Sequence, residues 1–308
     1  MHFRIGTRAS ALAMAQADLV RELLRKRGMV SEVVPFQTRG DRILDRALDE
    51  IPGKGLFTTE LEQALLTGEV DCAVHSLKDL PVQLAPGLVL GAYLPREDPR
   101  DALISPHPVQ GLDDLPANSV LATSSVRRRS AVHNLRPDVC VVPVRGNLAT
   151  RLAKMEREGW DGLILAAAGL KRLGWDDRIR ALLDPSVFVP APGQGVVVVE
   201  IRADDASARE TVTRIDDSST AALATAERAL LARLGGGCQI PLGAHAVWLA
   251  ASQLRLTAKI TATDGRRTTM ATAVGADSEA TAEVVAGKLL ASGGLALLDG
   301  QGEAPHAR

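Results

Sequence analysis

The hydrophobic and polar positions along the first two thirds of the chain alternate between two periods. Short runs rich in β-branched and apolar residues predict strands, and apolar residues recur at helical spacing between most of these runs. Over residues 10–27, for example, Leu12, Leu19, Leu23 and Leu24 share one helix face opposite charged residues. The strands are expected at 3–5, 30–36, 70–74, 88–93, 119–122, 139–144, 161–167 and 196–201. This alternation predicts α/β domains with mostly parallel sheets that helices cover on both faces.

Capping residues mark the starts of several expected helices. Thr59 and Glu62 have the spacing of a capping box, at the start of a helix that reaches Leu66. Ser125 and Asn147 are candidate N-caps of two further helices.

The pattern changes near residue 218, where a smaller unit is expected to begin. Its first helix covers 220–234 and ends at Gly235, a residue type common just after a helix C-terminus. The alternating stretches AHAVWLA and LRLTAKITAT and a helical pattern near 278–290 follow, and they predict a small antiparallel sheet with helices. Upstream, the segments 95–101 and 189–195 are rich in proline with charge or glycine, and we expect them to cross between two α/β domains. No internal repeat is visible.

Composition limits the class of protein. The chain has 308 residues, of which 46% are hydrophobic, and its net charge is −1, as in an ordinary soluble globular protein. No apolar run is long enough to span a bilayer, and the N-terminus lacks a long apolar core, so we expect a cytoplasmic protein without membrane association. The three cysteines form no disulfide framework; Cys72 and Cys140 lie in apolar runs, where a thiol is usually buried. No metal site is visible.

Five polar clusters follow predicted strands, at the edge where open α/β sheets bind ligands. They contain TRAS after 3–5, HSLKD after 70–74, TSSVRRR after 119–122, RGN after 139–144 and AGLKR after 161–167. Guanidinium groups near helix N-termini bind carboxylates or phosphates well, so Arg8, Arg145 and Arg172 together predict a cleft for a polyanionic ligand. For the run Arg127 to Arg129 taken alone, the solvated face of a helix is the favoured interpretation.

Two residues are candidates for chemistry. Asp79 lies where a strand ends, and it could face the reacting atoms while Lys78 holds a substrate carboxylate; an Asp–Lys surface pair in a turn fits the sequence equally well. Cys238 follows three glycines after a helix C-terminus, a place that does not lower a thiol pKa. An open backbone there suits an anchor for a bulky group better than a nucleophile, and a plain buried loop thiol fits as well.

The ordered motifs TRASALAMAQA, FQTRGD, GKGLFTTELE, DCAVHSLKDLP, REDPRDAL, TSSVRRR, RGNLATRL, LAAAGLKRLG, PAPGQG and LGGGCQIPLG resemble those of the porphobilinogen deaminase (hydroxymethylbilane synthase) family. The likeness runs from about residue 3 to 245. It implies an enzyme of tetrapyrrole synthesis that joins four porphobilinogen molecules head to tail with loss of ammonia and then releases hydroxymethylbilane by hydrolysis. It also implies a monomer.

The resemblance assigns roles to individual residues. Cys238 would hold a dipyrromethane cofactor through a thioether, and Asp79 would protonate and release the substrate amine and stabilise the cationic pyrrole that forms. The acetate and propionate groups of the pyrroles would explain the arginines. Cofactor contacts are expected, besides Cys238, from Lys78, Ser125, Arg127, Arg128 and Arg145. Substrate contacts are expected from Arg8, Ser10, Phe57, Arg151, Arg172 and Gln194; Phe57 would stack near the incoming ring and Gln194 lies at a hinge.

The implied fold has two doubly wound α/β domains like those of periplasmic binding proteins and a small α+β C-terminal domain. Domain 1 is expected over 1–95 and 196–214, domain 2 over 100–190 and domain 3 over 218–308. Three residues depart from the family pattern, namely Ala11, Glu50 and Pro52, and they leave the charge and flexibility of the 43–58 loop open.

Other classes of protein fit parts of the sequence. A non-catalytic solute-binding protein would explain two α/β domains that close on an anion, but it gives Asp79 and Cys238 no purpose. A nucleic-acid binder disagrees with the near-neutral charge and the scarcity of aromatic residues. A cysteine-dependent hydrolase needs a partnered histidine, and His75, His133 and His245 fall in no recognisable pairing.

Overall fold

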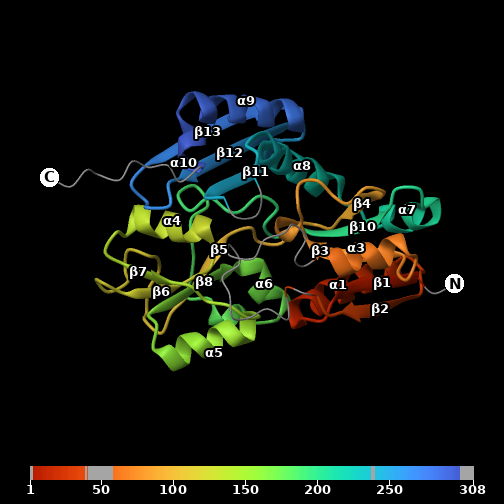
Figure 1. Ribbon diagram of the computed structural model, residues 1–308, viewed down its shortest axis with the longest axis horizontal. Coiled ribbons are helices and arrows are strands. Elements are labelled where there is room, and N and C mark those ends of the chain that lie inside the picture. Colours follow the sequence, from red (N-terminus) through yellow and green to blue (C-terminus); the bar gives the residue numbers. More distant parts are fainter. Residues whose placement is uncertain (1–2, 39, 41–57, 237–239, 299–308) are drawn as a thin grey trace.

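The computed structural model describes residues 3–38, 40, 58–236 and 240–298, and it contains three β-sheets with helices packed on them (Figure 1). The strands are β1 Phe3–Arg8, β2 Ser31–Phe36, β3 Cys72–Ser76, β4 Leu88–Tyr93, β5 Asp101–Ile104, β6 Val120–Ala122, β7 Cys140–Val142, β8 Gly162–Ala166, β9 Ala181–Leu182, β10 Val197–Arg202, β11 Leu242–Ala250, β12 Gln253–Thr261 and β13 Thr268–Gly275. The helices are α1 Ala11–Lys26, α3 Thr59–Leu66, α4 Val126–Leu135, α5 Leu148–Glu158, α6 Ala167–Arg172, α7 Ala206–Thr213, α8 Ser218–Arg233, α9 Ser278–Ala291 and α10 Gly294–Leu298, with short 3₁₀ turns η2 Leu77–Asp79 and η3 Asp176–Arg178.

The first sheet has the strand order β2-β1-β3-β10-β4. Helices α1 and α7 bury apolar residues on one face, where Ala17, Val20 and Val212 meet Val197 and Val199 of β10. Helix α3 covers the opposite face through another apolar cluster. The sheet is therefore covered on both sides, as the sequence pattern predicts.

The second sheet has the order β7-β6-β8-β5-β9, with α4 on one face and α5 and α6 on the other. Strands β6, β7 and β8 are parallel, with helices on both faces, and β7 lies at the edge of the sheet. Cys140 begins β7 and is exposed, so the expectation of a buried thiol there is wrong. The reason is its position on the edge strand, which the local apolar run does not reveal.

The prediction of mostly parallel sheets is wrong in part. Strand β10 runs antiparallel to both of its neighbours, β3 and β4, and β5 runs antiparallel to β8 and β9. In the first sheet, β10 is antiparallel because the chain reaches it after forming the second sheet and enters the first sheet from the opposite direction. The α/β class itself is confirmed, with a small α+β unit at the C-terminal side.

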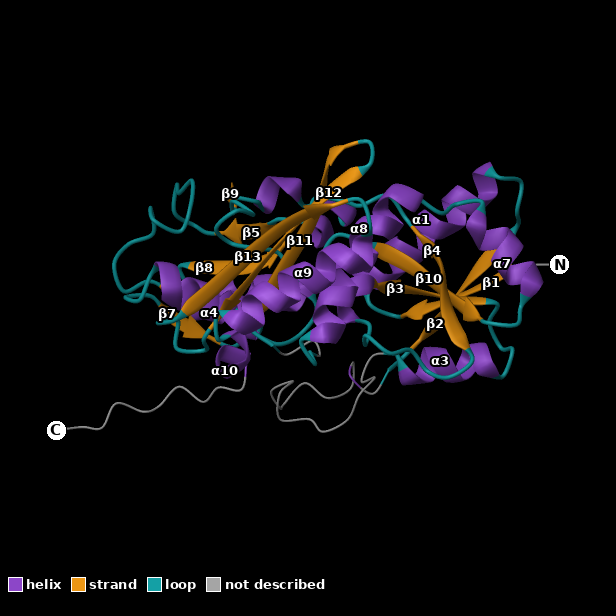
Figure 2. Cartoon of the chain, turned by 90° about the horizontal axis from the view of Figure 1, so that it is seen from above, coloured by secondary structure: helices purple, strands orange, loops and turns teal. Residues whose placement is uncertain are grey.

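The third sheet is antiparallel, with the order β11-β12-β13. Helices α8 and α9 pack beside it, and Figure 2 shows α9 lying along the sheet. Leu230 and Leu234 from the α8 end and Val285 and Leu289 from α9 fill the core with apolar residues of the strands. This agrees with the small antiparallel unit expected after residue 218.

The helix caps agree with the sequence in two cases and differ in one. Ser125 accepts a hydrogen bond from the Arg128 amide, and Asn147 accepts one from the Thr150 amide, so both N-caps are confirmed. The capping box at Thr59 is wrong, because Thr59 is the first residue of α3 and the N-cap is Thr58. The Thr58 side chain makes no capping hydrogen bond.

The two chain crossings lie side by side. The Glu97 amide donates to the Gly195 carbonyl at 3.1 Å, and Arg96 Nε donates to the Gln194 carbonyl at 2.9 Å. Gly195 has φ of +89°, and a Cβ there would overlap the Glu97 carbonyl oxygen. Only glycine permits both this backbone angle and this close approach. The crossings place the ends of the first two sheets next to each other.

No helix within the described ranges is both long and apolar enough to cross a bilayer. Where the domain boundaries fall within these units stays a prediction.

Candidate functional site

Asp79 ends the 3₁₀ turn that follows β3, and its side chain is exposed. Arg8 ends β1, the neighbouring parallel strand, and Ser10 is the N-cap of α1 directly after it. The carboxyl ends of parallel strands meet at one edge, so these three residues come together although they are far apart in sequence. They line one pocket, together with His75 from β3 and Thr58 before α3.

Lys78 lies in the same turn, and its side chain points toward the second crossing. Its Nζ donates a hydrogen bond to Gln194 Oε1 at 3.3 Å. Burial, reinforced by the charge of Arg128, lowers the pKa of Lys78 to about 8. Lys78 and Asp79 therefore lie at the border between the pocket and a second group of cations. The sequence also allows Lys78 and Asp79 to be an isolated surface pair in a turn. The contact of Lys78 with Gln194 does not fit that alternative.

Arg127 and Arg128 are buried around Asp101, the first residue of β5. The Nη1 of Arg127 lies 2.8 Å from Asp101 Oδ2, and the Nη2 of Arg128 lies 2.7 Å from Asp101 Oδ1. Burial works to raise the pKa of Asp101, but the two guanidinium groups outweigh it and hold that pKa well below its usual range. The interpretation of the arginine run as a solvated helix face is wrong for these two residues, because their partner lies on a strand that the local sequence does not show.

Gln194 connects this ion cluster to Lys78. Its Nε2 donates to Asp101 Oδ1 at 3.0 Å and to the Pro99 carbonyl at 2.8 Å, while Oε1 accepts from Lys78 and from Arg128. Gln194 is fully buried and lies on the second crossing. One carboxamide thus joins Lys78 of the turn after β3, Asp101 of the second sheet and Pro99 of the first crossing.

Three further predicted arginines surround this region. Arg151 is half-buried, and burial together with the charge of Arg128 lowers its pKa to about 10, with Arg145 adding to the effect. Arg172 donates to the Gly195 carbonyl at 2.7 Å, and burial lowers its pKa as well. Burial is the main cause of both lowered pKa values, and nearby cations contribute only at Arg151.

Three acidic residues matter here that the sequence does not assign. Asp101 is one. Glu200 on β10 accepts a hydrogen bond from His75 at 3.0 Å, and both side chains are buried. Glu227 on α8 is fully buried and accepts from Arg96 and from the amides of Gly193 and Ala246. Their partners are distant in sequence, so no local signal identifies them.

Several predicted residues lie outside the described residues. They are Cys238, Phe57, Glu50 and Pro52. Helix α8 ends at Arg233 and β11 begins at Leu242, so Cys238 belongs to the connection between these two elements.

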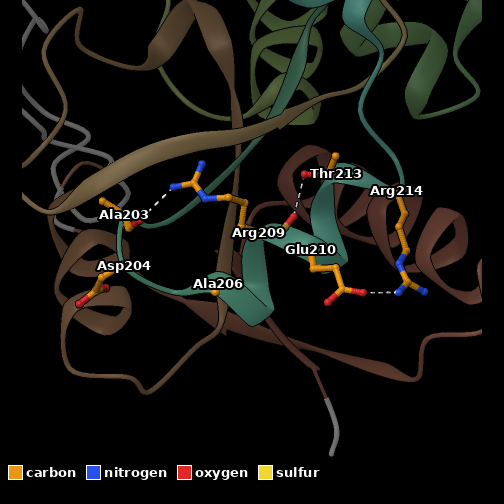
Figure 3. A pocket seen from close by; sticks show the side chains of 7 residues that line it. All are labelled: Ala203, Asp204, Ala206, Arg209, Glu210, Thr213 and Arg214. Carbon is orange, nitrogen blue, oxygen red and sulfur yellow. Dashed lines mark hydrogen bonds and ion pairs between the residues drawn. The ribbon is translucent and has the colours of Figure 1, made fainter.

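A larger hollow lies over α7, away from the site (Figure 3). Three of its charged side chains bond to groups within it: Arg214 pairs with Glu210, and Arg209 donates to the Ala203 carbonyl. None of the predicted site residues lines it. Among the described residues, no group of three or more histidine, cysteine, aspartate or glutamate side chains is placed to hold a metal ion.

Fold and site together define a class: an α/β protein with a pocket at the edge of one sheet and a cluster of cationic side chains beside it, at the edge of a second sheet. Two family models match the chain. One, described as "Porphobilinogen deaminase, dipyromethane cofactor binding domain", matches residues 3–210, and the other, "Porphobilinogen deaminase, C-terminal domain", matches residues 221–292. The chain belongs to the porphobilinogen deaminase family.

Curated relatives with this name agree over nearly the whole chain. A porphobilinogen deaminase of Burkholderia thailandensis is 47% identical over 302 residues, which cover 96% of this chain and 91% of the relative. Another, of Desulfitobacterium hafniense, is 45% identical over 297 residues and 96% of both chains. One of a Roseiflexus species is 46% identical over 299 residues, or 96% of this chain and 98% of the relative.

Solved structures with a distant likeness include a nutrient-binding protein from Burkholderia cenocepacia bound to methionine. It has a TM-score of 0.42 and 14% identity, with 68% of this chain and 90% of that chain covered. A periplasmic substrate-binding protein of an ABC transporter from Coxiella burnetii has a TM-score of 0.42 and 12% identity over 73% of this chain and 96% of its own.

Proposed function

We propose that this protein is a hydroxymethylbilane synthase that condenses four porphobilinogen molecules head to tail, with loss of ammonia at each step, and then releases the linear product by hydrolysis. Family membership supports the reaction. The observation that carries the proposal is the meeting of Asp79 with Arg8 and Ser10 in one pocket, beside the buried cations around Lys78.

The cation cluster fits the dipyrromethane group named in the description of the matching family model. Such a group carries several carboxylates. Burial lowers the pKa values of Lys78 and Arg151, and the charge of Arg128 lowers both further, with Arg145 adding to the effect at Arg151. Carboxylates bound among these cations would offset both effects. Ser125 and Arg127 lie on the same helix start and belong to the same proposed contact set.

Within that set, Arg127 has a largely positional role in our proposal. Its Nη1 donates to the Val189 carbonyl and pairs with Asp101, and its guanidinium lies 5.7 Å from the centre of the Phe188 ring. These contacts fix the start of α4, where Arg128 and Ser125 are presented. The Nε of Arg127 is buried and has no partner among the described residues.

Cys238 is the proposed anchor, through a thioether. The group bound there would supply the free pyrrole end to which each incoming substrate is joined. Asp79 has the exposure that a proton donor to the leaving amine needs, and after departure of ammonia its carboxylate would stabilise the positive charge on the substrate pyrrole. Arg8 and Ser10 orient the incoming substrate. Arg172 and Gln194 hold the two crossings in place beside the site through hydrogen bonds to backbone carbonyls.

Intact mass spectrometry of the denatured protein tests the anchor. The wild type should exceed its sequence mass by two linked pyrroles, and Cys238→Ser should not. Consumption of porphobilinogen with release of ammonia tests the reaction. A wild-type protein that stays unmodified after incubation with porphobilinogen, and does not consume it, would overturn the proposal and favour a polycarboxylate-binding protein.

A further inference from the structure

The hydroxyl of Thr58 is the most unusual polar group in the pocket of Arg8, Ser10 and Asp79. Thr58 is 2% exposed, and its Oγ1 is buried without a hydrogen-bond partner in the described structure. A buried hydroxyl that makes no hydrogen bond is costly, so such groups usually have a partner or a function. The inference drawn here from this group rests on the proposed function.

Within the described residues, this hydroxyl has no structural role in capping α3. Thr58 is the N-cap of α3, and an N-cap threonine normally accepts a hydrogen bond from the first turn of its helix. Its backbone does start the helix, because its carbonyl accepts from the Glu62 amide at 2.8 Å, but its side chain makes no such bond. Two other hydroxyls nearby are used within the protein: Ser10 accepts from the Ala13 amide and Thr7 donates to the Ala13 carbonyl.

We infer that Thr58, which lines the same pocket as the α1 start, donates a hydrogen bond to a carboxylate oxygen of the pyrrole substrate and so is a further substrate-positioning residue. The pocket favours an anion there. Arg8 supplies a positive charge, and α1 and α3 both begin at the pocket, where helix dipoles favour negative charge. A hydroxyl also donates a stronger hydrogen bond to a carboxylate than to a neutral acceptor.

Thr58→Val tests this inference, because it replaces the hydroxyl by a methyl group of nearly the same shape. The KM for porphobilinogen should rise about three- to tenfold, as expected for one lost hydrogen bond, with kcat nearly unchanged. Thr58→Ser keeps the hydroxyl and should keep KM within about twofold. The thermal midpoint of Thr58→Val should stay equal or rise, because an unpaired buried hydroxyl is removed.

This combination of weaker substrate binding with undiminished stability is what separates a ligand-binding role from a structural one. Ser31→Ala is the matched control, since Ser31 Oγ is also buried without a partner but lies at the first residue of β2, away from the pocket. It should change neither KM nor kcat. A fall in the thermal midpoint of Thr58→Val with an unchanged KM would overturn the inference.

A double variant identifies the group that the hydroxyl meets. If Thr58 and Arg8 hold the same carboxylate, the increase in KM for Thr58→Val with Arg8→Lys should be smaller than the product of the two single effects. An increase in KM equal to the product of the two single effects would mean that the hydroxyl contacts another substrate group, and it would overturn the inferred contact with the carboxylate. The wild type is assayed first. If it does not consume porphobilinogen, the proposed function itself is overturned, and this outcome differs from any result of the Thr58 variants.

Discussion

His75 Nε2 donates a hydrogen bond to Glu200 Oε2 at 3.0 Å, and the two side chains are 5% and 0% exposed. They lie on β3 and β10, adjacent antiparallel strands of the first sheet. His75 also lines the pocket of Asp79. This pair therefore links β3, which leads to the turn containing Asp79, to β10, the strand that returns after the second sheet.

Removing Glu200 should destabilise the fold. Glu200→Ala leaves His75 buried without its partner, so the free energy of unfolding should fall by about 3 kcal/mol, and Glu200→Gln, which can still accept the hydrogen bond, should cost less. Urea denaturation measures both. Glu210→Ala breaks an exposed pair with Arg214 and should change stability by less than about 1 kcal/mol. Equal effects of Glu200→Ala and Glu210→Ala would show that the buried pair contributes little.

Asp79→Asn should lower turnover without changing the stability of the fold. Asp79 is exposed and lines the pocket, so the amide should be accommodated with an unchanged thermal midpoint. Loss of the proton donor should lower kcat by about 10²- to 10⁴-fold. Steady-state assays of porphobilinogen consumption measure this, and turnover within a few-fold of the wild type would remove Asp79 from the mechanism.

Substrate binding should weaken above about pH 8, where Lys78 loses its proton, because burial lowers its pKa to about 8. The KM for porphobilinogen should rise as the pH passes this value. Lys78→Arg keeps its charge to higher pH, and its KM should show no such rise. A rise of the same size in both proteins would assign the titration to another group.

The same lysine affects stability with a defined sign. In the unfolded chain its pKa is about 10.4, so between about pH 8 and that value the unfolded chain binds more protons than the folded one. Stability therefore gains a contribution that rises with pH in this window, and the cost of burying the charged lysine is fully present below it. Denaturation at several pH values should show this gain in the wild type, and Lys78→Met should lack it.

Asp101→Asn should be far more damaging than the loss of an exposed carboxylate. It leaves Arg127 and Arg128 buried with no counter-charge, and the expected loss is about 3 to 5 kcal/mol. Asp138→Asn, at the more exposed pair with Arg136, should lose about 1 kcal/mol or less. Guanidinium denaturation compares them, and similar losses would contradict a central role for Asp101.

Gly195→Ala should disturb the crossings. The residue has φ of +89°, and the added methyl would overlap the Glu97 carbonyl, so a loss of at least about 2 kcal/mol is expected. Gly111→Ala meets no atom within 4 Å and serves as the control, with little change expected. A tolerated Gly195→Ala would mean that the crossings can separate at low cost.

The sequence predicts elements well where a pattern is local. Strand β4 is expected and found at residues 88–93, α1 differs from its expected 10–27 by one residue at each end, and both side-chain N-caps at Ser125 and Asn147 are confirmed. Periodicity and capping depend on neighbours within one or two turns, so a single chain segment contains the information.

Misses occur where a property depends on distant segments. Strand β5 is not expected, because its four residues carry no alternating pattern and Asp101 follows a proline-rich crossing. Cys140 has the local pattern of a buried residue, but an edge position exposes it. The antiparallel direction of β10 depends on where the chain returns, which no local sequence pattern shows.

For the site, the sequence by itself determined which residue types stand at the ends of strands, and ten ordered motifs determined the family. Only the tertiary structure decided which of these groups meet: Arg8 with Asp79 in one pocket, Lys78 with Gln194, and two of the arginines with Asp101. The physical reason is that burial and charge pairing act between surfaces brought together by folding. A cation's solvation, and with it its pKa, is set by those surfaces and not by its neighbours in the chain.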